Sequence, residues 1–308
     1  MVLRNYMRFN QEVSLALQTG KPIVALESAV ITHGMPYPEN LHIAQSMQEE
    51  IRSLDATPAT VAVIDGMLLI GLEEGQFERL STDRSTIKIS RRDFAPAFAA
   101  KRSGGTTVAG TILASRAAGL RVFATGGIGG IHRNAPFDVS PDLPELARTP
   151  MVVVCAGAKA ILDLPATIEY LETMGVPVLG FETEEFPAFY SRESGLRVQV
   201  RVDSIEEIAD IARCHWEMGF ESAVLVVVPP PQETALPRQA VDGAITLAVE
   251  ELHTRKIYGQ AVTPFLLNRV SELTGGDSLK TNIALLLNNA RVAARIAAVL
   301  PVQNQNKI

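Results

Sequence analysis

The sequence predicts an α/β protein in which a mainly parallel central sheet carries helices on both faces, an αβα sandwich. Short apolar runs alternate with segments of helical periodicity over most of the 308 residues, which is typical of strands joined by crossover helices. Several runs are apolar on both sides, as strands between two helical layers are. With 47% hydrophobic and 20% charged residues, the chain can bury a large core.

The predicted elements are short runs rich in valine and isoleucine for strands, and apolar repeats at three- and four-residue intervals for helices. In chain order they are strand Ile23–Leu26, helix Leu41–Leu54, strands Val61–Ile64 and Ile87–Ile89, helix Thr107–Ala118, strands Val122–Ala124 and Val152–Cys155, helix Ala160–Met174, strand Val178–Phe181, helix Ser204–Met218, strand Val224–Val228, and helices Ala240–His253 and Leu279–Leu300. Pro229–Pro231 is the strongest breaker, but it follows a strand directly. We therefore expect a single domain over residues 1–308 with a C-terminal helical layer.

Charge and cysteine content argue against several classes of function. The net charge is -6 and no run of lysines and arginines occurs, which argues against a nucleic-acid polymer as partner. Cys155 and Cys214 form no metal-binding or disulfide pattern. The N-terminus lacks the long apolar segment of a signal peptide, and the apolar runs are shorter than the roughly 20 residues of a membrane helix. We expect a soluble, cytoplasmic protein with no membrane partner.

The segment from Val122 to Lys159 holds most of the candidate chemistry. Two glycine pairs, Gly126–Gly127 and Gly129–Gly130, follow its first strand, and His132 stands where the dinucleotide fingerprint needs a third glycine. An NAD site is therefore disfavoured. A backbone cradle for a smaller ligand fits better, because missing Cβ atoms allow close approach. A tightly packed turn is the alternative interpretation.

Two further features could bind an anion. Gly104–Gly105 precedes a helix that Thr106 or Thr107 can cap, and free N–H groups at a helix start bind phosphate. The alternative is a capped helix after a loop, since no Walker lysine follows the glycines. Lys88 interrupts an apolar strand, where its charge needs either a substrate phosphate or a structural carboxylate.

Two aspartates, Asp138 and Asp142, lie in the segment FDVSPDL. Oxygen ligands with no nearby histidine or cysteine cluster suit Mg²⁺ or Mn²⁺ rather than zinc. Pro141 makes a continuous helix doubtful, so we expect both side chains to point into one loop. Aspartate and serine are also common turn residues, which is the other interpretation.

Lys159 and Glu27 are the candidate catalytic residues. Lys159 closes the run VVVCAGAK, at the end of a predicted strand and the start of a predicted helix, where open parallel sheets place their ligands. Partial burial there favours a neutral amine, which can form a Schiff base. Glu27 ends the first predicted strand among apolar residues, a setting that raises a carboxyl pKa and suits a general acid.

These segments together resemble the pseudouridine-5'-phosphate glycosidase family, also called indigoidine synthase A-like proteins. Pro141 stands where the family often has alanine, and Asn134 where glycine is common; Pro141 could alter how Ser140 and Asp142 are presented. The resemblance runs in family order over roughly residues 12 to 300 and rests on PIVALESAVITHGMPYPEN, ATPATVAVIDGMLLIGL, KISRRDFAPAFAAKRSGGTTVAGT, FATGGIGGIHR, FDVSPDL, VVCAGAKAILD, LETMGVPVLGFETEEFPAFY and VTPFLLNRVSELTGGDSLKTNIALLLNNA.

The resemblance implies reversible cleavage of the C–C glycosidic bond of pseudouridine 5'-phosphate to uracil and ribose 5-phosphate, in a homotrimer with one Mn²⁺ per subunit. By matching motifs, Glu27 resembles the proton donor, Lys159 the nucleophile and Asp138 the metal ligand. The positions that resemble substrate contacts are Lys88, Val108, His132, Ser140, Pro141, Asp142 and Asn282. Two other functions remain open: a Schiff-base aldolase acting on another sugar phosphate, and a non-catalytic nucleotide-binding protein.

Overall fold

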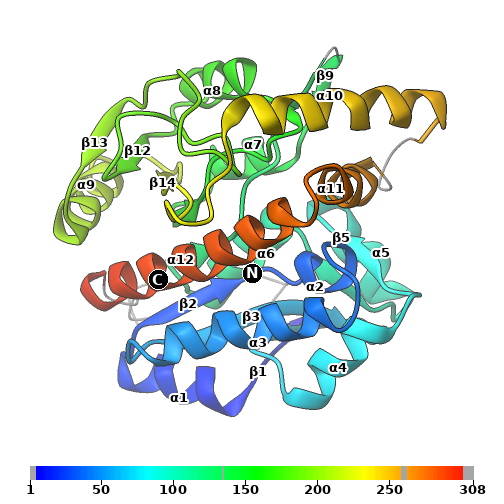
Figure 1. Cartoon of the computed structure of the whole chain (residues 1–308). Helices are drawn as coiled ribbons and strands as arrows, with labels where there is room; N and C mark the ends of the chain where they lie inside the picture. The colour runs from blue at the N-terminus through cyan, green and yellow to red at the C-terminus, as the bar shows by residue number, and fades with distance from the viewer. Residues whose placement is uncertain (1–4, 134, 258–261, 301–308) are drawn as a thin grey trace.

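The computed structural model describes residues 5–133, 135–257 and 262–300 (Figure 1). Within these ranges, eleven strands form one mixed sheet in the order β1-β4-β3-β2-β7-β10-β14-β12-β13, with β6 beside β3 and β5 beside β6. Its strands are β1 (Met7–Phe9), β2 (Ile23–Leu26), β3 (Thr57–Ile64), β4 (Met67–Ile70), β5 (Ile87–Ile89), β6 (Gly104–Thr106), β7 (Val122–Ala124), β10 (Val152–Cys155), β12 (Val178–Phe181), β13 (Val200–Val202) and β14 (Val224–Val227). A smaller sheet has the order β11-β8-β9, from β8 (Ile131–His132), β9 (Ala135–Val139) and β11 (Leu162–Asp163).

The central sheet is mainly parallel, as predicted. β2 pairs in parallel with β3 and β7, and parallel pairing continues through β10 and β14 to β12 and β13. Antiparallel pairing occurs where β3 meets β4 and β6. The β3–β4 hairpin turns at Asp65 (φ 50°) and Gly66 (φ 75°), and two positive φ values are what a two-residue type I′ turn requires.

Helices cover both faces of the sheet. α12 packs across β2, β7 and β10, between α3 and α9, and lies in front of the sheet in Figure 1. α6 contacts β2, β3 and β4 and lies behind them. The helices are α1 (Gln11–Thr19), α2 (Ala29–His33), α3 (Glu39–Arg52), α4 (Glu74–Thr82), α5 (Phe94–Ala99), α6 (Val108–Ala118), α7 (Asp142–Leu146), α8 (Leu164–Thr173), α9 (Ile205–Glu217), α10 (Arg238–Thr254), α11 (Val262–Leu273) and α12 (Asp277–Val299), with a 3₁₀ turn η2 (Arg91–Asp93).

The predicted strands are confirmed, and one predicted helix is wrong at its start. β2, β5, β7, β10 and β12 have the expected bounds, whereas β3 begins earlier, at Thr57. The helix expected from Ala160 begins at Leu164 instead, because Asp163 caps it by accepting the Ala166 N–H at 3.0 Å. The residues before the cap form β11, which pairs with β8.

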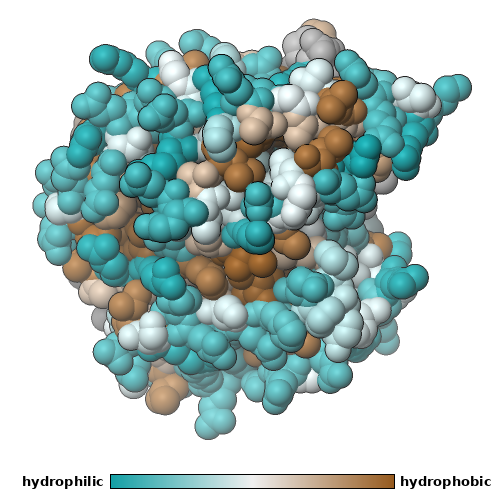
Figure 2. All heavy atoms as spheres, in the orientation of Figure 1, coloured by the Kyte–Doolittle hydropathy of each residue, from teal (hydrophilic) through white to brown (hydrophobic). Residues whose placement is uncertain are grey.

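The face of the molecule that carries α12 is largely hydrophilic (Figure 2). Apolar side chains gather near α12 and on α10, where Leu247 is exposed. No helix in the described part of the chain is both long enough and apolar enough to span a bilayer.

Candidate active site

A cavity of about 420 Å³ opens at the carboxyl ends of β2, β7 and β10, where open parallel sheets place their ligands. We call it the Lys159 cavity. Every residue that the sequence analysis assigned to the site lines it: Glu27, Lys88, Val108, His132, Asp138, Ser140, Pro141, Asp142, Lys159 and Asn282. The fold therefore brings together residues that are far apart in the chain, while their individual roles remain predictions. Asn134, the other departure from the family pattern, lies outside the described residues.

Glu27 follows the last residue of β2, where it is half-buried and lines the cavity. The Thr125 hydroxyl donates a hydrogen bond of 2.5 Å to Glu27 Oε1. Burial raises the pKa of Glu27 above its ordinary value, and this effect outweighs the positive charge of Lys159 and the Thr125 bond, which both lower it. The shift has the direction expected from the sequence. Glu27 therefore holds its proton at a higher pH than an exposed glutamate does.

Lys159 lies on the loop that joins β10 to β11, and not at a helix start as the sequence suggested. Its N–H donates to the Ile128 carbonyl at 3.1 Å, and its carbonyl accepts from Leu162 N–H at 3.0 Å. Ala158 also bridges to Ile128, so the backbone on both sides of Lys159 is fixed. Among the described residues, none is hydrogen-bonded or ion-paired to the Lys159 ammonium group. The side chain is available to a ligand.

Lys88 lies in the middle of β5, paired in register with Gly105. Burial and the charge of Lys159 lower the pKa of Lys88 to about 8, while Glu27 acts in the opposite direction. Burial and the charge of Lys88 also lower the pKa of His33 to about 4. Two mutually repelling ammonium groups beside a neutral histidine form a positive pocket, which suits an anionic ligand such as a phosphate.

Asp142 connects the start of α6 with the loop that carries Gly129. Its Oδ1 accepts from Ala109 N–H in the first turn of α6, and its Oδ2 accepts from Gly129 N–H, each at 2.8 Å. A Cβ on Gly129 would come within 2.1 Å of Ser140 Oγ, which explains why glycine is needed there. Asp142 thus holds the loop in place, and a direct contact with substrate stays a prediction.

Asp138 and Asp142 do not share a loop, contrary to the expectation from the sequence. Asp138 belongs to β9, whereas Asp142 is the first residue of α7 and Pro141 is its N-cap. Asp138 is exposed and lines the cavity, and among the described residues no three or more His, Cys, Asp or Glu side chains are placed together so that they could hold a metal ion. This donor set fits a hydrated Mg²⁺ or Mn²⁺ that keeps most of its waters, since such ions are often held by one or two carboxylates.

The start of α6 contributes backbone donors to the cavity. Thr107 caps the helix, because its Oγ1 accepts from Gly110 N–H at 3.3 Å. In the described chain no hydrogen bond uses the Val108 N–H, so this donor can meet a ligand. Gly104–Gly105 are strand residues of β6 that do not line the cavity, and a Cβ on Gly105 would come within 2.4 Å of Thr32 Oγ1. That pair is therefore needed for packing and not for binding.

The sequence analysis missed several cavity residues. Arg92 and Ser90 follow β5, and His33 ends α2. Phe189, Leu267 and Leu286 form an apolar part of the lining. A signal for Arg92 was present, because a strand that carries Lys88 leads directly into Ser90-Arg91-Arg92.

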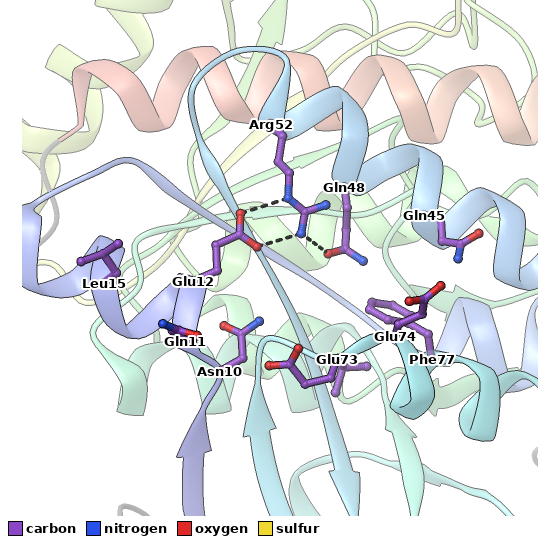
Figure 3. Close-up of a pocket in the computed structure, with 11 residues that line it drawn as sticks. Asn10, Gln11, Glu12, Leu15, Gln45, Gln48, Arg52, Glu73, Glu74 and Phe77 are labelled. Atoms are coloured by element: carbon purple, nitrogen blue, oxygen red, sulfur yellow. Dashed lines mark hydrogen bonds and ion pairs between the residues drawn. The ribbon is translucent and has the colours of Figure 1, made fainter.

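A second hollow, of about 520 Å³, lies between α1, α3 and α4 (Figure 3). We call it the Arg52 hollow. Arg52 donates to both carboxylate oxygens of Glu12, at 3.0 and 2.8 Å, and to Gln48 Oε1 at 3.1 Å. Its central cation is thus already neutralised and held by protein groups.

Comparison with known proteins gives consistent results. Residues 12–299 match the family described as indigoidine synthase A like protein. The pseudouridine-5'-phosphate glycosidase of Caldanaerobacter subterraneus subsp. tengcongensis is 49% identical over 300 residues, which cover 97% of this chain and 98% of that protein. The pseudouridine-5'-phosphate glycosidase of Geobacillus kaustophilus is 50% identical over 300 residues, covering 97% of this chain and all (100%) of that protein.

Solved structures agree in fold. The crystal structure of the prealnumycin C-glycosynthase AlnA in complex with ribulose 5-phosphate has a TM-score of 0.88 and 38% identity, covering 96% of each chain. An indigoidine synthase A-like protein from Thermotoga maritima has a TM-score of 0.88 and 35% identity, also covering 96% of each chain. Because residues 12–299 of its 308 residues match the family model, the chain belongs to the indigoidine synthase A-like family.

Proposed function

We propose that this chain is a pseudouridine-5'-phosphate glycosidase, which reversibly cleaves the C–C glycosidic bond of pseudouridine 5'-phosphate to give uracil and ribose 5-phosphate. One observation carries the proposal: relatives of that name are 49% and 50% identical over nearly the full length of both chains. The Lys159 cavity supports it, because it combines a buried acid, an unpaired amine and a positive pocket.

The chemistry of a C-glycoside explains why an amine is needed. The bond to be broken has no oxygen leaving group, so the two-carboxylate route of ordinary glycosidases lacks its usual proton acceptor. In the proposed reaction Glu27 gives its proton to the ribose ring oxygen as Lys159 Nζ bonds to C1′ and the C1′–O4′ bond breaks. The alkylated Nζ gives a proton back to the Glu27 carboxylate, and its lone pair then forms the C=N bond while the C1′–C5 bond breaks. Uracil C5 keeps the electron pair of that bond and takes up the proton from Glu27. Water hydrolyses the imine and releases ribose 5-phosphate.

The other cavity residues would bind and orient the substrate. Lys88 and the Val108 N–H suit the phosphate, because a cation and a free backbone donor both favour an anion. His132 and Asn282 offer ring and amide groups to the uracil carbonyl and N–H groups. The Ser140–Asp142 segment would contact the ribose.

Asp138 would hold Mn²⁺, one ion per subunit, with water completing the coordination. When bound, the ion polarises and orients oxygen groups near it. Titration of Mn²⁺ by calorimetry should give one site in the wild type and a site weakened at least about tenfold in Asp138→Asn. Equal affinity in both proteins would remove Asp138 from the metal site.

The proposal extends to the organisation of the protein. A continuous sheet through the molecule supports one domain over residues 1–308. We propose a cytoplasmic homotrimer; Phe137, exposed at 98%, is the kind of apolar side chain that a subunit interface buries. Sedimentation velocity checks the oligomeric state, and a monomer at micromolar concentration would contradict it.

The test is incubation with pseudouridine 5'-phosphate and Mn²⁺, before and after EDTA. Uracil and ribose 5-phosphate should appear in equal amounts. Addition of borohydride during turnover should reduce the imine and leave ribose 5-phosphate attached to the peptide that contains Lys159. Turnover with no adduct would argue against the imine, and an aldehyde cleavage product in place of uracil would indicate an aldolase.

A further inference from the structure

Thr125, the residue that contacts Glu27, is itself fixed on three sides. It follows β7, and its N–H donates to the Val154 carbonyl at 3.0 Å. Its carbonyl accepts from Asn289 Nδ2 at 2.9 Å. Its hydroxyl donates to Glu27 at 2.5 Å. With both backbone groups bonded, the direction of the Cα–Cβ bond is set, and the bond to Glu27 selects the rotamer of the hydroxyl.

Asn289 is completely buried on α12, and its position is not explained by packing alone. Its exposed fraction is 0%, and its Oδ1 has no hydrogen-bond partner among the described residues. An unsatisfied buried polar atom destabilises the fold, whereas an apolar residue of similar size at this position would leave no hydrogen-bonding group unpaired. A buried amide that makes one bond, to the residue that holds Glu27, is typical of a functional site.

The position of Asn289 on its helix links it to the cavity. Asn282 and Leu286, on the same helix, line the cavity, and spacings of four and three residues place all three side chains on one face. α12 also packs on β2 and β7, the strands that end at Glu27 and Thr125. One face of α12 therefore contacts both the Lys159 cavity and Thr125, the residue that is hydrogen-bonded to Glu27.

We propose that Asn289 is a positioning residue for Glu27 and acts through Thr125. The expected effect of Asn289 on catalysis rests on the proposed function. Its effect on the pKa of the Glu27 carboxyl does not, because that pKa can be measured in the protein without substrate. Four groups then set the ionisation of Glu27 besides burial: Thr125 from β7, Lys159 from the β10 loop, Lys88 from β5 and Asp142 from α7. The Thr125 bond favours the carboxylate and so opposes the effect of burial.

The test compares four variants. Thr125→Val removes the hydroxyl at constant shape, and Thr125→Ser keeps it. Asn289→Leu removes the bond to Thr125 and fills the same space, and Asn288→Ala is the matched control, because Asn288 is the neighbouring asparagine and is outside the cavity lining. Titration of ¹³C-labelled glutamate by NMR, with Glu27→Gln to assign the signal, gives the carboxyl pKa without substrate.

Thr125→Val should raise the Glu27 pKa by about one unit and Asn289→Leu by about half a unit, with Thr125→Ser and Asn288→Ala unchanged. The alkaline limb of the kcat pH profile should move upward by the same amounts. Where Asn289→Leu does not fold, Asn289→Ala replaces it. A Glu27 pKa that is unchanged in the Asn289 variant would overturn the proposal. Shifted titrations in a protein that releases no uracil would instead reject the proposed function and keep the positioning role.

Discussion

The Lys159 cavity and the Arg52 hollow differ in what their polar groups already contact. The two are of comparable size, at about 520 Å³ for the hollow and about 420 Å³ for the cavity. In the hollow Arg52 makes a bidentate ion pair with Glu12. In the cavity Lys159 has no such partner among the described residues, and buried acidic and basic groups have shifted pKa values.

Unsatisfied charge therefore distinguishes the two sites, whereas their volumes do not. Shifted pKa values and unpaired charged groups cost folding free energy, and they concentrate where function requires them. The two sites also differ in the direction of the strands that lead into them, because β1 and β4, which lead into the hollow, run opposite to β2 and β3. The cavity lies at the carboxyl ends of the parallel strands, where ligand sites are expected.

The largest effect should come from Lys159→Ala. Loss of the nucleophile should lower kcat by at least about 10³-fold, because Lys88, the other lysine that lines the cavity, is assigned to the phosphate in the proposed reaction. Uracil release at saturating substrate measures it, and Lys21→Ala, which changes an exposed lysine, is the control. Activity within tenfold of wild type would show that the cavity does not work through an imine.

Glu27→Gln should lower kcat about 10²- to 10⁴-fold and at the same time stabilise the fold. The folded pKa of Glu27 is raised above 4.5, so its contribution to stability is fully present below that value and is lost as pH rises through the folded pKa. The variant should therefore melt at a higher temperature than wild type at pH 8, with the difference shrinking toward pH 4. Equal melting temperatures of the two proteins at pH 8 would show that the ionised Glu27 carboxylate does not destabilise the folded state.

Lys88→Met should raise KM about 10- to 100-fold with a smaller effect on kcat, since Lys88 is assigned to the phosphate. Lys88 has a pKa of about 8 in the free protein, so it is charged below that pH and neutral above it. Wild-type kcat/KM should accordingly fall as pH rises through 8, and the variant should lack that limb. If kcat/KM of the variant still falls as pH rises through 8, a group other than Lys88 causes that fall.

The buried strands were predictable because their apolar runs are unbroken. β10 is buried along its whole length, whereas the edge strands β1 and β13 each expose two of their three residues and carry little apolar signal. β4 was missed although Asp65-Gly66, a strong hairpin signal, precedes it. The predicted start of the helix at Ala160 was wrong because the prediction used apolar periodicity alone and did not consider Asp163 as the N-cap.

The cavity residues were predictable from motifs, but their partners were not. Thr125 and Asn289 are 164 residues apart in sequence, so no local pattern connects them. The same holds for Asp142, whose carboxylate bonds to Ala109 and Gly129 and so holds two segments together. Sequence spacing indicates which groups have useful chemistry, whereas three-dimensional contacts decide which of them are already occupied.

The smallest effect should come from the Arg52 hollow. Arg52→Leu removes an ion pair whose side chains are 45% and 38% exposed, and such pairs contribute about 0.2–1 kcal/mol. The melting temperature should fall by about 1–3 °C, with kcat and KM unchanged, and Glu12→Gln should do the same. The double variant should fall by less than the sum of the two, because the partners lose one shared interaction. A tenfold loss of activity in either variant would show that the Arg52 hollow contributes to the reaction, and would contradict the separation of the two sites.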